Sequence, residues 1–427
     1  MLLDLPLDIL DEIGDRMDLR DIKALRGACQ DLCATLDPRF FGALALATHK
    51  LVCERDADVD ALTALARGGT KWSRYTKTLR ILSPWRLPPG AAEDAKRLAA
   101  KRALLVSALG ALQNLRTVAW EANEYDPSWL VDAVCDSLLM FPALEDLDLN
   151  LENRGPLALA GISGLKIFKI QSTGYNSPPR GAQVAQIVAQ SPGLRALHIV
   201  GDAGADGGDV WRMLAARGGG GSTSGLADVT ADAVTGDLLA YLDTYVGAEV
   251  LRLVHADTGR LAESDRLADT FFAAVLPRHA PTLRVLECTA DHDGRWSFGP
   301  HCADSLRQLH ALTHLEVSVN AGDVAPPRSV VTLLLDTALQ LPALQRLTIS
   351  FSYPWTSGRV WYGNGLMRFE TRANGAIRAA VESFRAHAHD APSRAVVFAG
   401  GTHFALAPVE DGDGLHMYSY QRVVWGS

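Results

Sequence analysis

Several residues of this chain have types and spacings that could support chemistry. His310 and His314 are four residues apart, a spacing at which two histidines on one helix face can bind a metal ion. They flank Leu312, however, and the aliphatic pattern there predicts the entry to a strand, so we interpret both as surface histidines. Asp146 and Asp148 would lie on one side of a predicted strand. No pocket-forming pattern accompanies them, and they are interpreted as surface charge.

Three other candidates have simple interpretations. Cys29 and Cys33 lie four residues apart in an apolar pattern and are expected in a helical core. Residues 217–225 are rich in glycine but lack the G-K-[ST] ending of a phosphate-binding loop, so we interpret them as a flexible insertion. His387 and His389 end a predicted helix, where the helix dipole favours histidine.

G-x-S-x-G and H-E-x-x-H motifs are absent from the sequence. We predict no catalytic residues, no metal site and no cofactor, and we do not expect an enzyme.

Composition and charge narrow the class of protein. The 427 residues are 48% hydrophobic and 21% charged, enough for two or three domains or one elongated repeat array. The net charge of -8 argues against a general binder of nucleic acid or anionic membranes. No apolar run approaches the roughly 20 residues of a membrane span, and the N-terminus lacks a basic signal region. Because the six cysteines are scattered without a C-x-x-C pair, we expect a cytosolic or nuclear protein.

The elements that would position functional residues begin with a helical segment at the N-terminus. Pro6 suits a first helical turn, and apolar residues then follow along one helical stripe: Ile9, Leu10, Ile13 and Met17. Asp18 can cap a second helix, and Pro38 is expected to end it and to begin a third helix through Leu44. Three such short helices cannot bury all of their apolar side chains among themselves. They must pack on the rest of the chain or on a partner.

The order of these residues resembles the F-box, a helical module that docks proteins onto the Skp-type adaptor of cullin–RING ubiquitin ligases. The matching positions are Leu5-Pro6, Ile9-Leu10, Ile13, Met17, Asp21-Ile22, Leu25 and Ala28-Cys29. Gly14 and Leu32 depart from the family, which commonly has an aromatic residue and a tryptophan there. The resemblance implies an adaptor contact formed by Leu5, Pro6, Leu10, Ile13, Ile22 and Leu25, and through the adaptor a cullin.

A second pattern, L-x-x-L-x-L with L any aliphatic residue, recurs along the rest of the chain. Its copies begin at Leu115, Leu144, Leu165, Leu194, Ala248, Leu283, Leu312 and Leu344, with poorer copies at Thr76 and Leu226. Several copies are preceded by a proline that ends a predicted helix, as in the phrase Phe141-Pro142-Ala143-Leu144. Their spacing resembles leucine-rich repeats, whose period is roughly 20 to 29 residues. The copies are uneven in length, and few carry the asparagine typical of that family.

Together these patterns predict an α/β fold with four parts. They are an F-box-like module of three helices (1–50), linking helices with a first irregular repeat (51–112), an irregular leucine-rich-repeat solenoid (113–352) and a C-terminal β cap (353–427). A mixed α/β domain with coincidental leucine spacing is the alternative fold. The resemblances imply a substrate-recruiting subunit of an SCF-type ubiquitin ligase, in which other subunits do the catalysis. A Skp-bound scaffold outside ubiquitin ligation, or an enzyme with an unrecognised site among the C-terminal aromatic residues, remains open.

The strand pattern also predicts a target-binding face. Residues between the paired aliphatics should point outward, and they are Ala119, Asp148, Lys169, His198, Arg252, Glu287, Glu316 and Thr348. Their mixed signs argue against nucleic acid and favour a protein target with patchy charge. We expect Lys169, His198 and Arg252 to form a basic central patch, with Asp148 and Glu287 beside it. The aromatic segment 353–362 either walls the end of this face or packs the cap.

Overall fold

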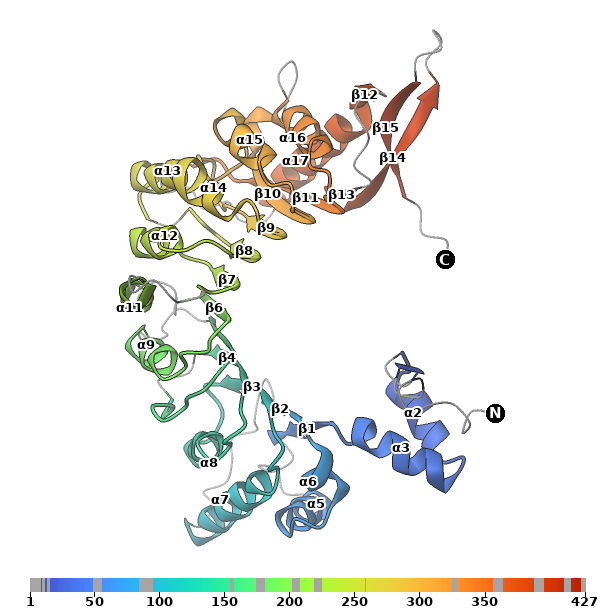
Figure 1. The fold of residues 1–427 in the computed structure, drawn as a ribbon, viewed down its shortest axis with the longest axis vertical. Coiled ribbons are helices and arrows are strands. Elements are labelled where there is room, and N and C mark those ends of the chain that lie inside the picture. The colour runs from blue at the N-terminus through green and yellow to red at the C-terminus, as the bar shows by residue number, and fades with distance from the viewer. Residues whose placement is uncertain are drawn as a thin grey trace. The chain divides into compact units, whose positions relative to one another are not determined.

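The computed structural model describes residues 9, 12–13, 16–48, 56–83, 95–153, 157–173, 181–201, 208–218, 225–257, 259–324, 329–355, 364–387, 395–410 and 416–423. This part of the chain is a mixed α/β protein dominated by parallel strands, which confirms the expectation of an α/β protein (Figure 1). The chain forms two compact units. The first comprises Met1–Leu194 with Gly201–Ala203, and the second comprises Arg195–Val200 with Gly204–Ser427.

The first unit places helices between parallel strands. In order, its described elements are α2 (Leu19–Arg26), α3 (Gln30–Phe40), β1 (Ala43–Ala47), α5 (Asp56–Ala66), α6 (Lys71–Tyr75), β2 (Thr78–Leu82), α7 (Ala95–Gly110), β3 (Thr117–Asn123), α8 (Ser128–Leu138), β4 (Asp146–Glu152), β5 (Ile167–Thr173) and α9 (Gly181–Ala189). Strands β1 to β5 pair in parallel and in chain order. Helices α7 and α8 lie on one side of this sheet, and no described helix covers its other face (Figure 1).

The second unit continues the same alternation and ends in antiparallel strands. Its first half contains β6 (Ala196–Gly201), α11 (Gly208–Gly218), β7 (Asp228–Ala231), α12 (Gly236–Asp243), β8 (Val250–Leu253), α13 (Leu261–Thr270), the π-helix η2 (Phe271–Val275), α14 (Leu276–His279) and β9 (Val285–Cys288). Its second half contains α15 (Pro300–Arg307), β10 (His314–Asn320), η3 (Ala321–Asp323), α16 (Val330–Leu339), β11 (Arg346–Ser352), α17 (Asn364–Ser383), β12 (Arg385–His387), β13 (Val396–Ala399), β14 (Thr402–Glu410) and β15 (His416–Arg422). Strands β6 to β11 and β13 are parallel, whereas β14, β15 and β12 pair in antiparallel fashion.

The second and third aliphatic residues of every predicted copy lie on a strand, including those of the two poorer copies on β2 and β7. The first aliphatic residue precedes the strand. Strand β4 is representative, because Leu147 and Leu149 are fully buried while Asp148 between them is half-exposed. The buried positions also match across strands, since Val118 pairs with Leu147 and Leu147 with Phe168. The alternation read from the sequence therefore sets both the register of the strands and the face that each side chain occupies.

A backbone ladder fixes the amino ends of the strands. The carbonyl of Arg116 accepts hydrogen bonds from the N–H groups of both Glu145 (2.8 Å) and Asp146 (3.0 Å) at the entry to the next strand. The same double acceptance recurs at Gly42, Lys77, Glu145, Arg195, Ala227, Glu249, Arg284 and Thr313. It satisfies entry N–H groups that side chains of the repeat would otherwise have to satisfy.

The predicted third N-terminal helix is wrong. Pro38 lies inside the last turn of α3, and Ala43–Ala47 forms strand β1, which pairs in parallel with β2. Pairing with β2 outweighs the helix-forming character of this alanine- and leucine-rich segment, because propensity is only a weak local preference. Strand β1 therefore extends the sheet of the first unit into the residues predicted for the helical module. In the second unit, β13 pairs in parallel with β11 and lies within the residues predicted for the C-terminal β cap.

Candidate functional site

The predicted adaptor-binding residues have different environments. Leu5, Pro6 and Leu10 lie outside the described residues. Ile13 and Leu25 are half-buried, whereas Ile22 is only 6% exposed and packs within the helical module. Ile9, which belongs to the motif, is 40% exposed, and Leu19, which lies between motif positions, is 65% exposed. Ile22 is therefore in a position to shape the module, and the exposed apolar side chains are in a position to contact a partner.

The two N-terminal helices are held together by a polar cluster around a buried carboxylate. Asp18 caps α2, as expected, by accepting hydrogen bonds from the N–H groups of Arg20 and Asp21. Asp37 on α3 accepts from Arg26 on α2 (2.6 Å) and pairs with Lys71 on α6 (2.6 Å). Burial opposes the charged form of Asp37, but the hydrogen bonds from Lys71 and Arg26 hold its pKa below the usual value. Lys71 thereby ties the helix pair to the start of the sheet in the first unit.

The predicted target-binding residues lie on the sheet face that the helices leave uncovered. In the first unit, Asp148 on β4 is the register neighbour of Lys169 on β5, and both are half-exposed. In the second unit, His198, Arg252 and Glu287 lie along β6, β8 and β9. The expectation that these residues point away from the core agrees with their exposure.

His198 and Arg252, which were expected to contribute to a basic patch, both contact carboxylates in the described part of the second unit. His198 Nε2 lies 3.1 Å from Asp228 Oδ1, and Arg252 Nη1 lies 3.2 Å from the same oxygen. Arg252 Nε also approaches Glu287 Oε2 at 3.7 Å. Asp228 on β7 thus neutralises the expected patch. Asp228 directly precedes Val229, the second aliphatic residue of the poorer repeat copy that begins at Leu226. Because side chains alternate along a strand, Asp228 points outward while Val229 points into the core.

One carboxylate on this face has an unusual environment. Glu316 on β10 is the register neighbour of Glu287 on β9. Burial raises the pKa of Glu316, the like charge of Glu287 raises it further, and Arg346 on β11 opposes both effects. Like charges directly opposite on neighbouring strands destabilise a sheet, so this pair is a local strain in the array.

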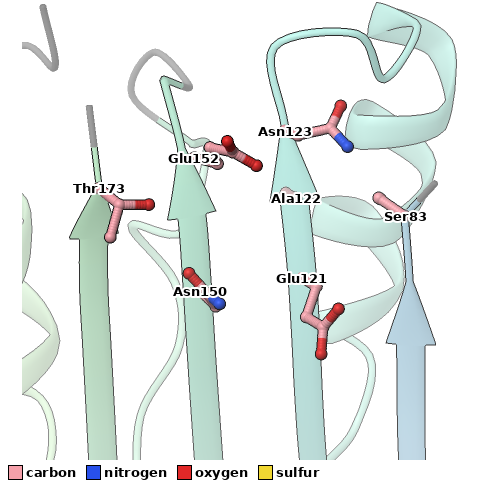
Figure 2. Close-up of a pocket in the computed structure, with 7 residues that line it drawn as sticks. All are labelled: Ser83, Glu121, Ala122, Asn123, Asn150, Glu152 and Thr173. Atoms are coloured by element: carbon pink, nitrogen blue, oxygen red, sulfur yellow. The ribbon is translucent and has the colours of Figure 1, made fainter. Parts of the chain in front are cut away.

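The first unit contains a pocket at the carboxyl ends of its strands, which the sequence interpretation did not include. Figure 2 shows the lining residues, which come from four successive strand ends: Ser83, Glu121, Ala122, Asn123, Asn150, Glu152 and Thr173. The cavity volume is about 160 Å³. Glu121 is the register neighbour of Asn150, and Asn123 is the neighbour of Glu152, which in turn neighbours Thr173.

The turn after β3 supports one wall of the pocket. Asp126 Oδ2 accepts hydrogen bonds from Ser83 Oγ (2.6 Å) and from the N–H of Asn123 (2.9 Å). Asn123 Oδ1 accepts from the N–H of Tyr125 (2.9 Å), which fixes the amide. Glu121 and Glu152, in contrast, are exposed and have no ion pair or hydrogen bond to any other described residue. The pocket therefore offers two available carboxylates beside a held amide.

The second unit uses the same edge of its sheet differently. After β9 the chain reaches the end of β11, where His292 forms an isolated parallel β-bridge with Tyr353. It then returns to β10, where Phe298 forms a second such bridge with Val319. It thereby crosses the carboxyl end of β10. Trp296 and Phe298 in this crossing segment (residues 289–299) are buried, as are three hydrogen-bonded serines: Ser297, Ser318 and Ser352.

Carboxylates hold the crossing segment in place. Asp257 accepts hydrogen bonds from the N–H groups of Asp291 (2.8 Å) and His292 (2.7 Å). Asp293 Oδ1 accepts from Ser352 Oγ (2.8 Å) and from the N–H of Ala321 (3.2 Å). Burial raises the pKa of Asp293 above its usual value, although these two hydrogen bonds partly oppose the shift. Polar groups at this edge are thus occupied with one another.

The remaining candidates have structural roles. His310 is exposed and His314 is the first residue of β10, which confirms their interpretation as histidines at a strand entry. Tyr353 donates a hydrogen bond to Glu370 of α17 (2.7 Å) and contacts Phe369, as expected for a residue that packs the cap. Among the described residues, no group of three histidine, cysteine, aspartate or glutamate side chains is placed to hold a metal ion.

No protein-family model matches this chain, and no curated protein matches it. Within the described part of the chain, no helix has the length and apolar character needed to cross a membrane.

Proposed function

We propose that this protein is the substrate-recruiting subunit of an SCF-type cullin–RING ubiquitin ligase. The observation that carries the proposal is the ordered match of residues 5–29 to the F-box pattern, from Leu5-Pro6 to Cys29. Two apolar side chains in this region, Ile9 and Leu19, are exposed and available for a partner contact.

We infer further that the strands form an irregular leucine-rich-repeat solenoid. The inference is supported by parallel strands in chain order, by the aliphatic pair on each strand and by the recurring backbone ladder. Its uncovered face would hold the target. Because Lys71 and Asp37 join the helix pair to α6 at the start of the sheet in the first unit, a target held on that unit is kept near the ligase, and a high effective concentration promotes ubiquitin transfer.

The adaptor contact can be tested with the full chain and a purified Skp-type adaptor. Leu5→Ala combined with Pro6→Ala should weaken adaptor binding by about 2–4 kcal/mol if these residues are interface anchors. The matched control is Leu139→Ala with Met140→Ala, since both side chains are 48% exposed and lie outside the motif. The control should bind like the wild type. Unchanged affinity in the first variant, with a normal unfolding transition, would contradict the proposal.

A scaffold outside ubiquitin ligation predicts a different result in the same system. The ligase subunit should bring a cullin into the complex through the adaptor, and the scaffold should bind the adaptor alone. Reconstitution with purified cullin, followed by size-exclusion chromatography, separates the two functions. An adaptor complex that excludes the cullin would favour the scaffold.

A further inference from the structure

We propose that the uncovered sheet face of the first unit binds an extended, basic segment of a protein partner, with one arginine or lysine side chain seated in the pocket at the strand ends. This inference rests on the proposed function, because the partner is the target that the ligase subunit captures. It narrows the expected target from a segment of patchy charge to one that is basic at alternating positions.

The charge on this face is arranged in a definite order. The outward side chains of β2 to β5 include four acidic residues against two basic ones, a net charge of −2 for the face. The acidic residues are Glu121, Asp146, Asp148 and Glu152, and all lie on the two inner strands β3 and β4. Arg80 and Lys169 lie on the flanking strands β2 and β5. A negative stripe thus runs along the middle of the face and complements a positively charged partner.

The carboxylates of this stripe differ from those of the second unit. There, Asp228 and Glu287 are engaged by His198 and Arg252. In the first unit, Glu121, Asp148 and Glu152 make no ion pair or hydrogen bond with the side chains or backbone of the described residues. Covering them with an apolar or acidic partner would remove their hydration without compensation, whereas a cation compensates for it.

The spacing along β4 fits an extended segment. Asp146, Asp148 and Glu152 occupy the same side of one strand, at positions separated by two or four residues. A strand rises about 3.3 Å per residue, so these carboxylates recur at multiples of about 6.6 Å. Alternate side chains of an extended peptide recur at the same distance. A segment that lies along β4 can therefore place a basic side chain opposite each carboxylate.

The pocket at the end of the stripe suits one head group. Glu121 and Glu152 lie on neighbouring strands with an offset of two residues, which places them roughly 7–8 Å apart. A guanidinium has five N–H donors in a planar fork and can reach both carboxylates and the amide oxygen of Asn150. The volume of about 160 Å³ is smaller than the roughly 300–1,000 Å³ of small-molecule sites, which favours a side chain over a free ligand.

The experiment uses the full chain and a labelled peptide, Gly-Arg-Gly-Arg-Gly-Arg-Gly, in fluorescence polarisation at fixed ionic strength. A peptide with three consecutive arginines has the same charge in the wrong spacing, and the glutamine version of the probe has no charge. We expect the alternating arginine peptide to bind more tightly than both. Equal binding of the two arginine peptides would overturn the extended geometry.

Removal of the pocket charges provides the decisive variant. Glu121→Gln with Glu152→Gln should weaken binding of the alternating peptide about tenfold or more, because the hydrogen bonds to the arginine lose the charge of two acceptors. Asp60→Asn with Asp132→Asn removes the same charge from exposed helix positions of the same unit and should leave binding unchanged. An equal loss in both variants would overturn the proposal in favour of general electrostatic attraction.

Two further measurements complete the test. Competition by millimolar Ca²⁺ alone, at constant ionic strength, would overturn the proposal in favour of a cation site. Adaptor binding by the Gln variant should equal that of the wild type. If the wild type binds the peptide but not the adaptor, the proposed ligase function fails while the basic-segment site stands, and the reverse result overturns the site alone.

Discussion

Five residues after the second aliphatic residue of the repeat pattern, three copies in each unit have a polar side chain. In the first unit these residues are Asn123, Glu152 and Thr173, and in the second they are Asp291, Asn320 and Ser352. The first three line an open pocket. In the second unit, Ser352 donates to Asp293, and Asn320 Oδ1 accepts from the N–H of Gly294 in the crossing segment.

The two units differ at this edge because the crossing segment covers the strand ends of the second unit, whereas the strands themselves are alike. A buried polar group without a partner costs about 1–3 kcal/mol, so an edge that is covered must satisfy its polar groups internally. An edge that stays open can leave them to water or to a ligand. The same strand position is therefore structural in the second unit and available for binding in the first.

The largest expected loss of stability comes from a substitution in the crossing segment that covers the strand ends of the second unit. Trp296→Ala should lower the free energy of unfolding by about 3–5 kcal/mol, because Trp296 is 1% exposed and packs against Phe271 and Phe272. Urea unfolding followed by circular dichroism provides the measurement. Trp355→Ala is the matched control, since Trp355 is 40% exposed, and it should cost about 1 kcal/mol or less. Equal losses would show that the crossing segment is not a packed element.

A pair of carboxylate substitutions tests the contrast directly. Asp257→Ala should cost about 1–3 kcal/mol, because the N–H groups of Asp291 and His292 lose their acceptor. Glu152→Ala should change the free energy of unfolding by less than about 0.5 kcal/mol, since this exposed side chain has no hydrogen bond to another described residue. The same urea titration measures both. A large loss for Glu152→Ala would mean that the edge of the first unit is structural too.

The smallest effect is a pH dependence at Asp293. Because its folded pKa is raised, the folded state binds a proton more readily than the unfolded state, and ionisation of Asp293 costs stability as pH rises through the folded pKa. The free energy of unfolding of the wild type should therefore rise, relative to that of Asp293→Asn, as pH falls from 7 toward 4. Urea midpoints across this range measure the difference. Parallel curves for the two proteins would contradict the assignment.

The strands could be predicted from the sequence because their signals are local. Strands β4 and β11 can be placed from a short pattern. In each, a proline ends the preceding helix, and two aliphatic residues then flank one polar residue. Strand β1 has no such signal. Its Ala-Leu-Ala-Leu-Ala sequence also suits a helix, and the strand state depends on pairing with β2, which is distant in the sequence.

The candidate sites were harder to predict because they depend on neighbours. His198 and Arg252 were correctly assigned to the outward side, but their shared contact with Asp228 depends on the register of β7. The pocket depends on the alternation continuing beyond the second aliphatic residue, to Glu121 and Glu152. If the alternation of inward and outward side chains is continued to the ends of the strands, it predicts that Glu121 and Glu152 lie on the same face.

The double-accepting carbonyls at the strand entries have a consequence for how this molecule tolerates change. Residues as different as Gly42, Arg116 and Thr313 serve there, because only the main chain takes part. Substitutions at Arg116 and Thr313 can therefore accumulate without altering the spacing of the strands, whereas a Cβ atom at Gly42 would lie 2.8 Å from the carbonyl oxygen of Pro38. Insertions at the opposite edge, such as residues 289–299, leave that spacing intact as well. A foreign loop grafted after β3 or β4 would therefore be expected to give the protein a new specificity while the rest of the array keeps its register.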